Sequence, residues 1–468
     1  MAKAWERELE IRQAAIPRIL TEEDQTWDLI DGLRQSQDAQ LKLLWYSEVP
    51  GSGAPECLML AAVQSAENRG LDVSTAEPIL DEALEAFRLG DMARVHGLTS
   101  RLLKALAEAP VDQASPYWRF TQVQTWEEHQ GATNFPAAIP VNVMTGEYAA
   151  RVYAGWLAQI CGGALGTALE GYTATRIAEV FGDVTGYVRD PNTYNDDITF
   201  EIAFLEAYAA RGHGVTSADI AEQWVALIPF GWSAEHIALQ NLKLGVYPPE
   251  SGTRSNPFCE WIGAQMRGAV CGLVAPGDAR EAARLAWVDG VISHSGNGVL
   301  GECFNAMITA LAFVRQEMRP LVEETAALIP ASTEYRWVLD QALAACREAG
   351  SPRAAWDRCE KLLEQYNWVH AYPNAAAQIV ALWFGDGDFD ETMRLIAMCG
   401  QDVDCNAAQI ATVIGVMRGE AAIPARWREP VGDLLQTYVR DRQRMSIRAL
   451  AEQTVAAVRQ HWAARPSN

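Results

Sequence analysis

The chain has 468 residues, of which 49% are hydrophobic and 21% are charged, a balance typical of soluble globular proteins. This length exceeds the roughly 250–300 residues at which a single hydrophobic core stops growing, so we expect one large domain with an additional region. The formal net charge of −22 argues against nucleic acid and anionic membranes as partners, because an acidic surface repels both.

Three features of the sequence predict a cytoplasmic protein. The first residues, MAKAWERELEIRQAA, are charged and lack the apolar run of a secretory signal peptide. No stretch reaches about 18 uninterrupted apolar residues, so we expect no membrane-spanning helix. The nine cysteines are scattered and form no C-x-x-C pair, so we expect buried, reduced thiols rather than disulfides.

Residues 1–144 are predicted to form an N-terminal helical extension. The segments PGSGAPE (50–56) and APVDQASPYW (109–118) interrupt its helices, because proline and glycine favour turns. The residues of this extension do not distinguish between a cap over a pocket, a surface for a target protein and a contact for oligomerisation.

From residue 145 onward the chain becomes richer in glycine and in alanine-rich segments with helical spacing. One helical face is formed by Phe200, Ala203, Phe204, Ala207 and Tyr208. A similar stripe over residues 407–414 ends near Gly419, a residue type that commonly stops helices. Strand candidates are short and few. We therefore predict an all-α fold, in which residues 145–430 form the main domain and residues 431–468 end in a helix that packs on it.

Two pairs of aspartates lie at the starts of two apolar helices. Asp196 and Asp197 are adjacent, and Asp402 and Asp404 are two residues apart, with Asn406 able to cap the second helix. Capping and the helix dipole explain one aspartate at a helix start, but two exceed what one cap requires. If the two helix starts converge, four carboxylates share a small volume, and some must stay protonated unless a cation binds. Divalent cations that prefer oxygen ligands, such as Mg²⁺, Mn²⁺ or Ca²⁺, fit such a site.

Four segments resemble, in the same order, the motifs of the ADP-ribosylglycohydrolases, the family that contains ADP-ribosyl-dinitrogen-reductase hydrolase. They are GGALGTALEGY (162–172), NDDIT (195–199), SHSGNGVLGE (293–302) and DVDCNAAQIATVIGVMRG (402–419). The segments YAGWLAQICGGALGTALEG and PPESGTRSNPFCEWIGAQMRG are similar to a bacterial branch of that family. The resemblance covers about residues 145–425. It implies an ADP-ribosylglycohydrolase-like orthogonal bundle of helices with two divalent cations, Mg²⁺ or Mn²⁺, as cofactors.

The resemblance also assigns roles to single residues. The implied metal ligands are Asn195, Asp196, Asp197, Asp402, Asp404 and Cys405. The implied catalytic residues are Glu170, Asp196, Asp197 and Asp404. Glu170 matches an acidic residue that lies beside the metals in relatives and assists catalysis, whereas one of the three aspartates would take a proton from water.

Two of the implied ligands depart from the family pattern. Asn195 stands where relatives have Thr or Ser, and its amide oxygen could replace that hydroxyl. Cys405 stands where relatives have Thr, and its sulfur is a soft ligand that matches Mg²⁺ poorly. One cation would therefore bind more weakly, unless Asn406 compensates.

Six residues are candidate contacts for the substrate. They are Arg254, Trp261, His294, Asn297, His370 and Asn374. Arg254 lies in a predicted loop over residues 247–256 and could contact an anionic group. The cluster NWVHAYPNAA (367–376) precedes an alanine-rich helix and could form an aromatic wall for a base or ring. His294 and Asn297 could face the pocket or could serve only structural roles.

Glu260 and Trp261 depart from the family pattern near the expected substrate. Many relatives place small residues here, with backbone donors near the phosphates of ADP-ribose. A carboxylate that faces a diphosphate is unfavourable, and Trp261 would fill the space unless it packs in the core.

The resemblance implies hydrolysis of an N- or O-glycosidic bond in an ADP-ribosylated protein or another ADP-ribosyl compound. Two metals would hold the vicinal hydroxyls of the ribose and lower the pKa of a water molecule. Two alternatives stay open. A hydrolase of a smaller riboside or other glycoside is favoured by Glu260 and Trp261, and a non-catalytic protein on the same fold is favoured by Asn195 and Cys405. The sequence does not distinguish the leaving group, the preferred metal or the oligomeric state.

Overall fold

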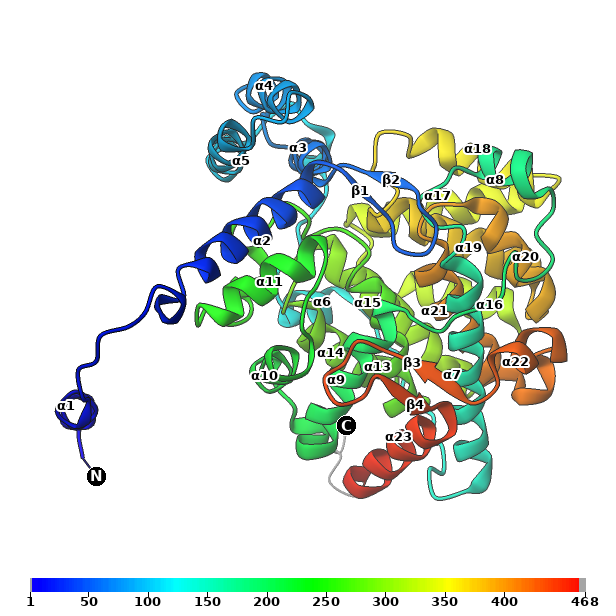
Figure 1. Ribbon diagram of the computed structural model, residues 1–468. Coiled ribbons are helices and arrows are strands. Elements are labelled where there is room, and N and C mark those ends of the chain that lie inside the picture. Colours follow the sequence, from blue (N-terminus) through cyan, green and yellow to red (C-terminus); the bar gives the residue numbers. More distant parts are fainter. Residues whose placement is uncertain (1, 463–468) are drawn as a thin grey trace.

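The computed structural model describes residues 2–462 and shows an all-α protein, as the sequence predicts (Figure 1). Within these residues the two sheets are short antiparallel hairpins. None of the helices in this part of the chain is long and apolar enough to cross a membrane. The nine cysteines are free thiols, and all of them except Cys57 are buried. Residues 463–468, the end of the predicted 431–468 segment, lie outside the described residues.

The described part of the N-terminal extension contains helices and one β-hairpin. Its elements are α1 (Ala4–Ala14), α2 (Asp28–Trp45), β1 (Ser47–Glu48), β2 (Pro55–Glu56), α3 (Leu58–Asn68), α4 (Glu77–Arg88), α5 (Met92–Ala107) and α6 (Trp126–Ala132). Helix α1 and the start of α2 project away from the rest of the molecule (Figure 1). The end of α2 packs on the extension through Leu41 and Trp45, and the indole N–H of Trp45 donates to Thr99 Oγ1 at 2.9 Å.

The hydrophobic core of the extension includes side chains from the main region. Ala234, Phe258 and Trp261 belong to the same buried cluster as the helices α2 to α5. The hydroxyl of Ser65 also donates to the carbonyl of Pro257 at 2.7 Å. The structure therefore places Trp261, a predicted substrate contact, in the core that joins the extension to the rest of the chain, where it is 1% exposed.

The main region is a bundle of helices followed by a hairpin and a last helix. Its elements are α7 (Gly146–Gly166), α8 (Ala174–Phe181), α9 (Asp196–Arg211), α10 (Ser217–Leu227), α11 (Ser233–Lys243), α12 (Glu250–Thr253), α13 (Ala269–Val274), α14 (Ala279–Gly290), α15 (Asn297–Ala312), α16 (Met318–Ala327), α17 (Glu334–Glu348), α18 (Pro352–Leu362), α19 (Ala371–Gly385), α20 (Phe389–Cys399), α21 (Val403–Arg418), α22 (Ala425–Val431), β3 (Leu434–Gln436), β4 (Arg444–Ser446) and α23 (Ile447–His461). Helix α12 lies in segment 247–256, which the sequence predicted as a loop. Helix α23 packs on α7, where Trp156 Nε1 donates to Thr454 Oγ1 at 3.0 Å.

Four helices form the centre of the main region. Helices α15 and α21 are buried along nearly all of their length, and so are most residues of α7 and α19. Apolar and small residues occupy most positions around each of these helices, which is the pattern of helices enclosed by other helices. The apolar face predicted for α9 is buried as well, and α21 ends before Gly419, which has a φ of 79°. The two helix assignments made from periodicity are therefore confirmed.

Glycines on α7 allow α21 to approach closely. A Cβ atom on Gly162 would lie 2.4 Å from the carbonyl oxygen of Ala407, and one on Gly166 would lie 2.0 Å from the backbone nitrogen of Asp404. Neither space admits a methyl group, so the close packing of the two helices requires glycine at both positions. Because Asp404 is an implied metal ligand, this contact also fixes the position of the candidate site.

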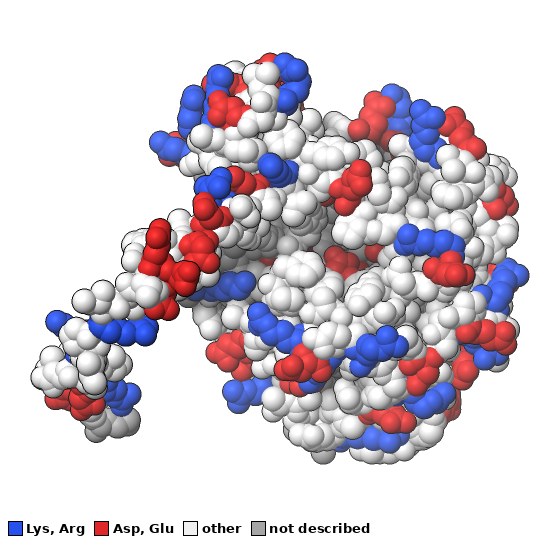
Figure 2. Space-filling model, in the orientation of Figure 1, with Lys and Arg blue, Asp and Glu red and all other residues white. Residues whose placement is uncertain are grey.

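The visible face of the molecule is hollowed beside α2, between the extension and the main region (Figure 2). Acidic side chains lie along α2 and within this hollow, and both acidic and basic side chains are dispersed over the rest of the face.

We expect Gly166→Ala to lower the free energy of unfolding by about 1–3 kcal/mol or more, because the added methyl group forces the start of α21 away from α7. Urea denaturation followed by circular dichroism measures the loss. Gly97→Ala is the matched control, since a Cβ atom at Gly97, in the exposed part of α5, would have nothing within 4 Å. That change should stabilise the protein by about 0.5–1 kcal/mol. Equal stabilities for the two variants would contradict the packing argument.

Candidate metal centre

The first turn of α9 carries two of the four aspartates. Asn195 is the N-cap of the helix, and its Oδ1 accepts a hydrogen bond from the backbone N–H of Asp197 at 2.7 Å. Asp197 is fully buried, whereas Asp196 is only partly buried. The amide oxygen of Asn195, a predicted metal ligand, thus already holds the start of α9.

The start of α21 carries the other two aspartates and is held by Asn374. The helix begins at Val403 with Asp402 as its N-cap, so the prediction that Asn406 caps it was wrong. Asn406 lies one turn inside the helix, because its N–H donates to the carbonyl of Asp402 at 3.1 Å. Its side-chain amide donates to Asn374 Oδ1 at 2.6 Å, and the N–H of Asp402 donates to the same oxygen at 3.1 Å. Asn374, a predicted substrate contact, therefore holds the start of α21 by accepting both hydrogen bonds.

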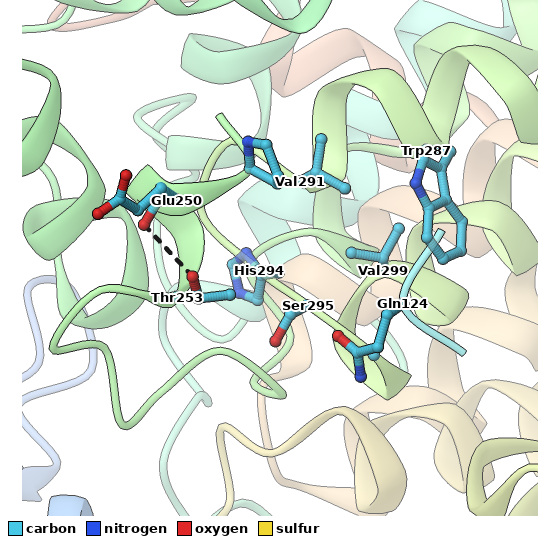
Figure 3. A pocket seen from close by; sticks show the side chains of 10 residues that line it. Gln124, Glu250, Thr253, Trp287, Val291, His294, Ser295 and Val299 are labelled. Carbon is cyan, nitrogen blue, oxygen red and sulfur yellow. Dashed lines mark hydrogen bonds between the residues drawn. The ribbon is translucent and has the colours of Figure 1, made fainter. Parts of the chain in front are cut away.

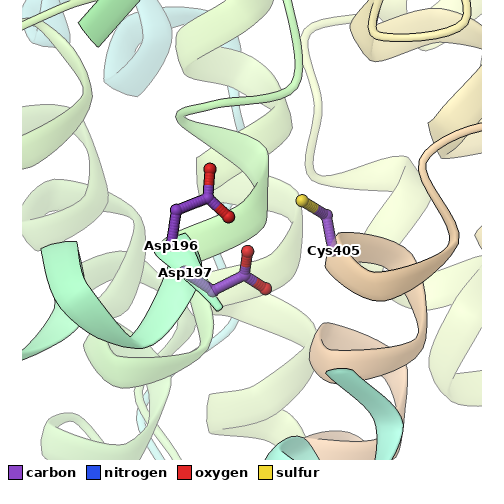
Figure 4. A group of neighbouring side chains, drawn as sticks. All are labelled: Asp196, Asp197 and Cys405. Atoms are coloured by element: carbon purple, nitrogen blue, oxygen red, sulfur yellow. The ribbon is translucent and has the colours of Figure 1, made fainter. Parts of the chain in front are cut away.

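The two helix starts converge on one volume (Figure 4). One carboxylate oxygen of Asp196, one of Asp197 and the sulfur of Cys405 all lie within 4.8 Å of one another, and the same holds for Asp402, Asp404 and Cys405. The thiol of Cys405 points from α21 across the gap toward the two carboxylates on α9 (Figure 4). We call Asp196, Asp197, Asp402 and Asp404 the acidic cluster, and Cys405 belongs to both of its halves.

The acidic cluster is electrostatically unsatisfied. Both carboxylate oxygens of Asp197, together with Oδ1 of Asp402 and Oδ1 of Asp404, have no hydrogen-bond partner among the described residues. Burial, and then the charge of neighbouring Asp196, raises the pKa of Asp197 well above its ordinary value. Burial, followed by the charges of Asp404 and Glu235, raises the pKa of Asp196 to about 7. Buried oxygens without donors are the donor set that a hard divalent cation takes, so these residues fit a metal centre.

Glu170 lies beside the acidic cluster on the segment that follows α7. Burial, and then the charge of Asp404, raises the pKa of Glu170 well above its ordinary value, and the two carboxyl groups share a hydrogen bond. The segment pairs with the loop before α21, since the N–H of Gly171 donates to the carbonyl of Gln401 at 2.9 Å and the N–H of Gln401 donates to the carbonyl of Tyr172 at 3.2 Å. Glu170 is partly exposed, unlike the fully buried Asp197.

The turn between β1 and β2 rests on the segment that carries Glu170. Tyr172 Oη donates to the carbonyl of Ser52 at 3.1 Å, and a Cβ atom on Gly171 would lie 2.6 Å from Cβ of Ala54. Arg189 donates to the carbonyl of Gly51 and ties the same turn to the end of α7. This contact points to a place for the extension at the rim of the candidate site, a role that its sequence left open.

Glu235 on α11 is a further acidic residue near the cluster that no sequence pattern singles out. It is 4% exposed, and its charge contributes to the raised pKa of Asp196. Arg267 donates to Glu235 Oε1 at 3.0 Å and also pairs with Asp289 and Glu302, so one buried cation lies among three carboxylates. These ion pairs link α11, α14 and α15 through Arg267.

Phe230 and Tyr438 form an aromatic pair near Asp196 that the sequence also did not predict. Their rings are stacked, with centroids 4.6 Å apart and planes inclined by 20°. Phe230 is 57% exposed. Burial, and then the charge of Asp196, raises the pKa of Tyr438 well above its ordinary value. The pair comes from two loops that are distant in sequence, so only the folded chain reveals it.

His294 lies at a separate cavity of about 360 Å³ (Figure 3). Its Nδ1 lies 2.7 Å from Ser293 Oγ, and its Nε2 has no hydrogen-bond partner among the described residues. Burial, and then the nearby charge of Arg267, holds the pKa of His294 well below its ordinary value, so the ring is neutral. The cavity is lined by Gln124, Trp287 and neighbouring residues, and no member of the acidic cluster lines it.

Asn297 and Glu260 bond to each other at the start of α15. Glu260 Oε1 accepts hydrogen bonds from Asn297 Nδ2 at 2.8 Å, from the N–H of Asn297 at 3.2 Å and from Tyr117 Oη at 3.0 Å. Glu260 is 2% exposed, so its carboxylate is not presented to solvent. It occupies the amide end of α15, and an anionic group of a substrate has to be held elsewhere.

The remaining predicted contacts differ in their surroundings. His370 caps α19 by accepting the N–H of Tyr372 on Nδ1, and its buried ring packs between Tyr366 and Tyr372. Burial holds its pKa at about 3, so His370 is neutral at pH 7. Trp368 is partly exposed and lies near Gly171, so it is the part of the predicted aromatic wall that approaches Glu170. Arg254 is exposed, pairs with Glu250 at 3.5 Å and does not join the acidic cluster.

Comparison with known proteins decides the family. A family model described as ADP-ribosylglycohydrolase matches residues 144–464. The chain belongs to the ADP-ribosylglycohydrolase family. An uncharacterized protein of Archaeoglobus fulgidus is 25% identical over 289 residues, which are 58% of this chain and 88% of that protein. A solved ADP-ribosylglycohydrolase-related protein complex is 20% identical, covers 68% of this chain and 99% of its own, and has a TM-score of 0.48.

We expect this member of the family, when freed of metal, to lose stability as the pH rises from about 4 to 8. The folded-state pKa of Asp196 is about 7 against an ordinary 3.8, and the pKa of Asp197 is raised as well. A raised carboxyl pKa favours the protonated folded form, so this contribution is complete below the ordinary pKa and is lost as the pH passes the folded-state pKa. Thermal unfolding of chelator-treated protein between pH 5 and 8 measures the trend. A melting temperature that rose across this range would contradict it.

Asp197→Asn should stabilise the metal-free protein at pH 8 by about 1–3 kcal/mol, because it removes a buried charge that lacks a partner. The same variant should lose the gain in melting temperature that added Mn²⁺ gives the parent protein. Asp219→Asn is the control, since Asp219 completes the capping box of α10 by accepting from the N–H of Thr216 and also pairs with Arg211. Its replacement should destabilise the protein slightly and leave the metal response intact. If Asp197→Asn instead lowers the stability of the metal-free protein, the buried carboxylate of Asp197 is not unfavourable and the argument is wrong.

Proposed function

We propose that this protein is a metal-dependent hydrolase that cleaves an N- or O-glycosidic bond to ADP-ribose, in a modified protein or in another ADP-ribosyl compound. Family membership supports the class of reaction. The observation that carries the proposal is the convergence of two helix starts that bring four carboxylates together, several of their oxygens buried without partners among the described residues. Burying carboxylates without partners lowers the stability of the fold, and a bound cation would compensate for this while it binds a sugar and water.

Two divalent cations, Mg²⁺ or Mn²⁺, are the cofactors in this proposal. Asp196 and Asp197 would hold one side of the centre, and Asp402 and Asp404 would hold the other. When bound, the cations would supply Lewis acidity that orients ribose hydroxyls and lowers the pKa of a water molecule. Asn195 and Asn374 hold the two helix starts in the geometry that binding needs.

Glu170 and Asp196 are the carboxylates that we assign to proton transfer. Both are partly exposed, whereas Asp197 and Asp404 are buried and suit the holding of a cation. Asp196 would accept a proton from the attacking water, and Glu170 would exchange a proton with the leaving group. The surrounding negative charge would also stabilise the positive charge that develops on the anomeric carbon in an oxocarbenium-like transition state.

The charges and rings near the acidic cluster indicate which forces would bind the substrate. The net charge of −22 gives an anionic nucleotide no electrostatic attraction, and Glu260 occupies the amide end of α15. The aromatic pair of Phe230 and Tyr438 offers a flat surface near Asp196, on which a planar part of the substrate can stack. We therefore propose that metal ligation and stacking, rather than charge attraction, account for most of the binding.

Calorimetric titration with ADP-ribose tests the proposal. We expect ADP-ribose to bind the protein in Mg²⁺ or Mn²⁺ and not to bind the chelator-treated protein, because the ribose hydroxyls need the cations. Asp197→Ala should abolish this binding, whereas Asp219→Asn should leave it unchanged. If the protein holds metal but does not bind ADP-ribose, the ADP-ribosyl substrate is wrong and a smaller glycoside takes its place. If neither metal nor ADP-ribose binds, the protein is not a metal-dependent hydrolase.

A further inference from the structure

We propose that the thiolate of Cys405 is a ligand shared by both halves of the centre and shifts its selectivity from Mg²⁺ toward thiophilic divalent ions. Co²⁺ and Zn²⁺ should bind more tightly than Mn²⁺, and Mn²⁺ more tightly than Mg²⁺. This inference rests on the metal centre of the proposed function and departs from it only in which divalent ion the centre binds most tightly. The residues that carry it are Cys405 itself and the carboxylates on either side of it.

The position of Cys405 is the first argument. Its sulfur lies within 4.8 Å of a carboxylate oxygen from Asp196, Asp197, Asp402 and Asp404, taken as two groups of three ligands. Ligands about 2.0–2.3 Å from an ion lie at most roughly 4–4.6 Å apart, so these separations are close to those around a bound ion. The side chain projects into the gap between α9 and α21 rather than into the surrounding core (Figure 4). Cys405 is 3% exposed, so solvent does not compete for the sulfur.

The second argument is that Cys405 differs from the other cysteines of the chain. Among the described residues it is the one cysteine in a group of candidate metal ligands. Cys161 and Cys303 are buried as well, but their thiols contact the backbone carbonyls of Trp427 and Ala283 at 3.5 Å. The thiol of Cys405 donates a weak hydrogen bond to the sulfur of Met266 at 3.8 Å and also bonds to the carboxylate of Asp402, a member of the acidic cluster. The oxygens of Asp197, which have no partner within residues 2–462, point to a ligand at the same place.

The chemistry of the sulfur determines the selectivity. The thiol loses its proton to solvent as the sulfur–metal bond forms, so each bound centre releases one proton from Cys405. Mg²⁺ demands hard oxygen ligands and gains little from a thiolate, whereas Zn²⁺ and Co²⁺ bind both thiolate and carboxylate. A mixed set of one sulfur and several carboxylate oxygens therefore favours the later transition metals without preventing Mn²⁺ from binding.

Cobalt spectroscopy on the full chain tests the ligand directly and needs no substrate. Chelator-treated protein titrated with Co²⁺ should develop a sulfur-to-cobalt charge-transfer band in the near ultraviolet. The band should be absent in Cys405→Ser, which keeps the size of the side chain, and should persist in Cys303→Ser, the matched buried control. Calorimetry on the same samples should show that Cys405→Ser still binds Co²⁺ through the carboxylates, with an affinity lower by about tenfold or more.

Competition between ions tests the selectivity. Protein equilibrated with equal concentrations of Zn²⁺ and Mg²⁺, then analysed for metal content, should contain mainly Zn²⁺, and Cys405→Ser should shift the ratio toward Mg²⁺. Circular dichroism confirms that the variant is folded, and Cys405→Ala repeats the test if it is not. Co²⁺ binding without a charge-transfer band, or a band that survives both variants, overturns this inference while the metal centre stands. No binding of any divalent ion overturns the inference and the metal centre together.

Discussion

Repulsion between buried carboxylates is the constraint on which the rest of this structure depends. Asp197, Asp402 and Asp404 are almost inaccessible to solvent. Burial raises the pKa of Asp197 and of Asp402, and the charges of neighbouring aspartates raise both further. Uncharged groups hold these aspartates in place. They are the N-termini of α9 and α21, whose dipoles favour negative charge, and the side chains of Asn195 and Asn374, which bond to the two helix starts. In the part of the chain that the structure describes, no lysine or arginine forms an ion pair with the cluster, so its charge stays available to a bound cation.

The close approach of α7 and α21 makes this arrangement rigid. Small residues bring the two helix backbones together, and Asp404 is placed by a backbone contact with Gly166 rather than by a flexible side chain. Near this pair, Arg267 forms ion pairs with Glu235, Asp289 and Glu302, so part of the negative charge of these three carboxylates is compensated. A rigid frame of this kind lets the ligands keep their geometry when the ion is absent.

The sequence predicts much of the fold, because the helices of the main region carry apolar faces that periodicity detects, as in α9 and α21. The acidic cluster could also be predicted, since each half is contiguous in sequence and matches a family motif. What the sequence could not show depends on contacts between distant segments. Glu235 and Tyr438 reach the cluster from α11 and a late loop, and Trp261 is buried because the extension covers it. Asn406 was taken for a cap because local spacing does not reveal that Asp402 already begins the helix.

The hairpin turn near Ser52 has a consequence for how this protein can be divided. The match to the family begins at residue 144, yet the segment that carries Glu170 is held by a turn that lies far before that point in the chain. A fragment cut at the start of the match would contain every residue of the acidic cluster but would lack the turn between β1 and β2 that contacts the segment carrying Glu170. The residues that match the family therefore do not include every residue that supports the candidate site. A fusion of this chain with another domain has to keep the N-terminal extension together with the matched region.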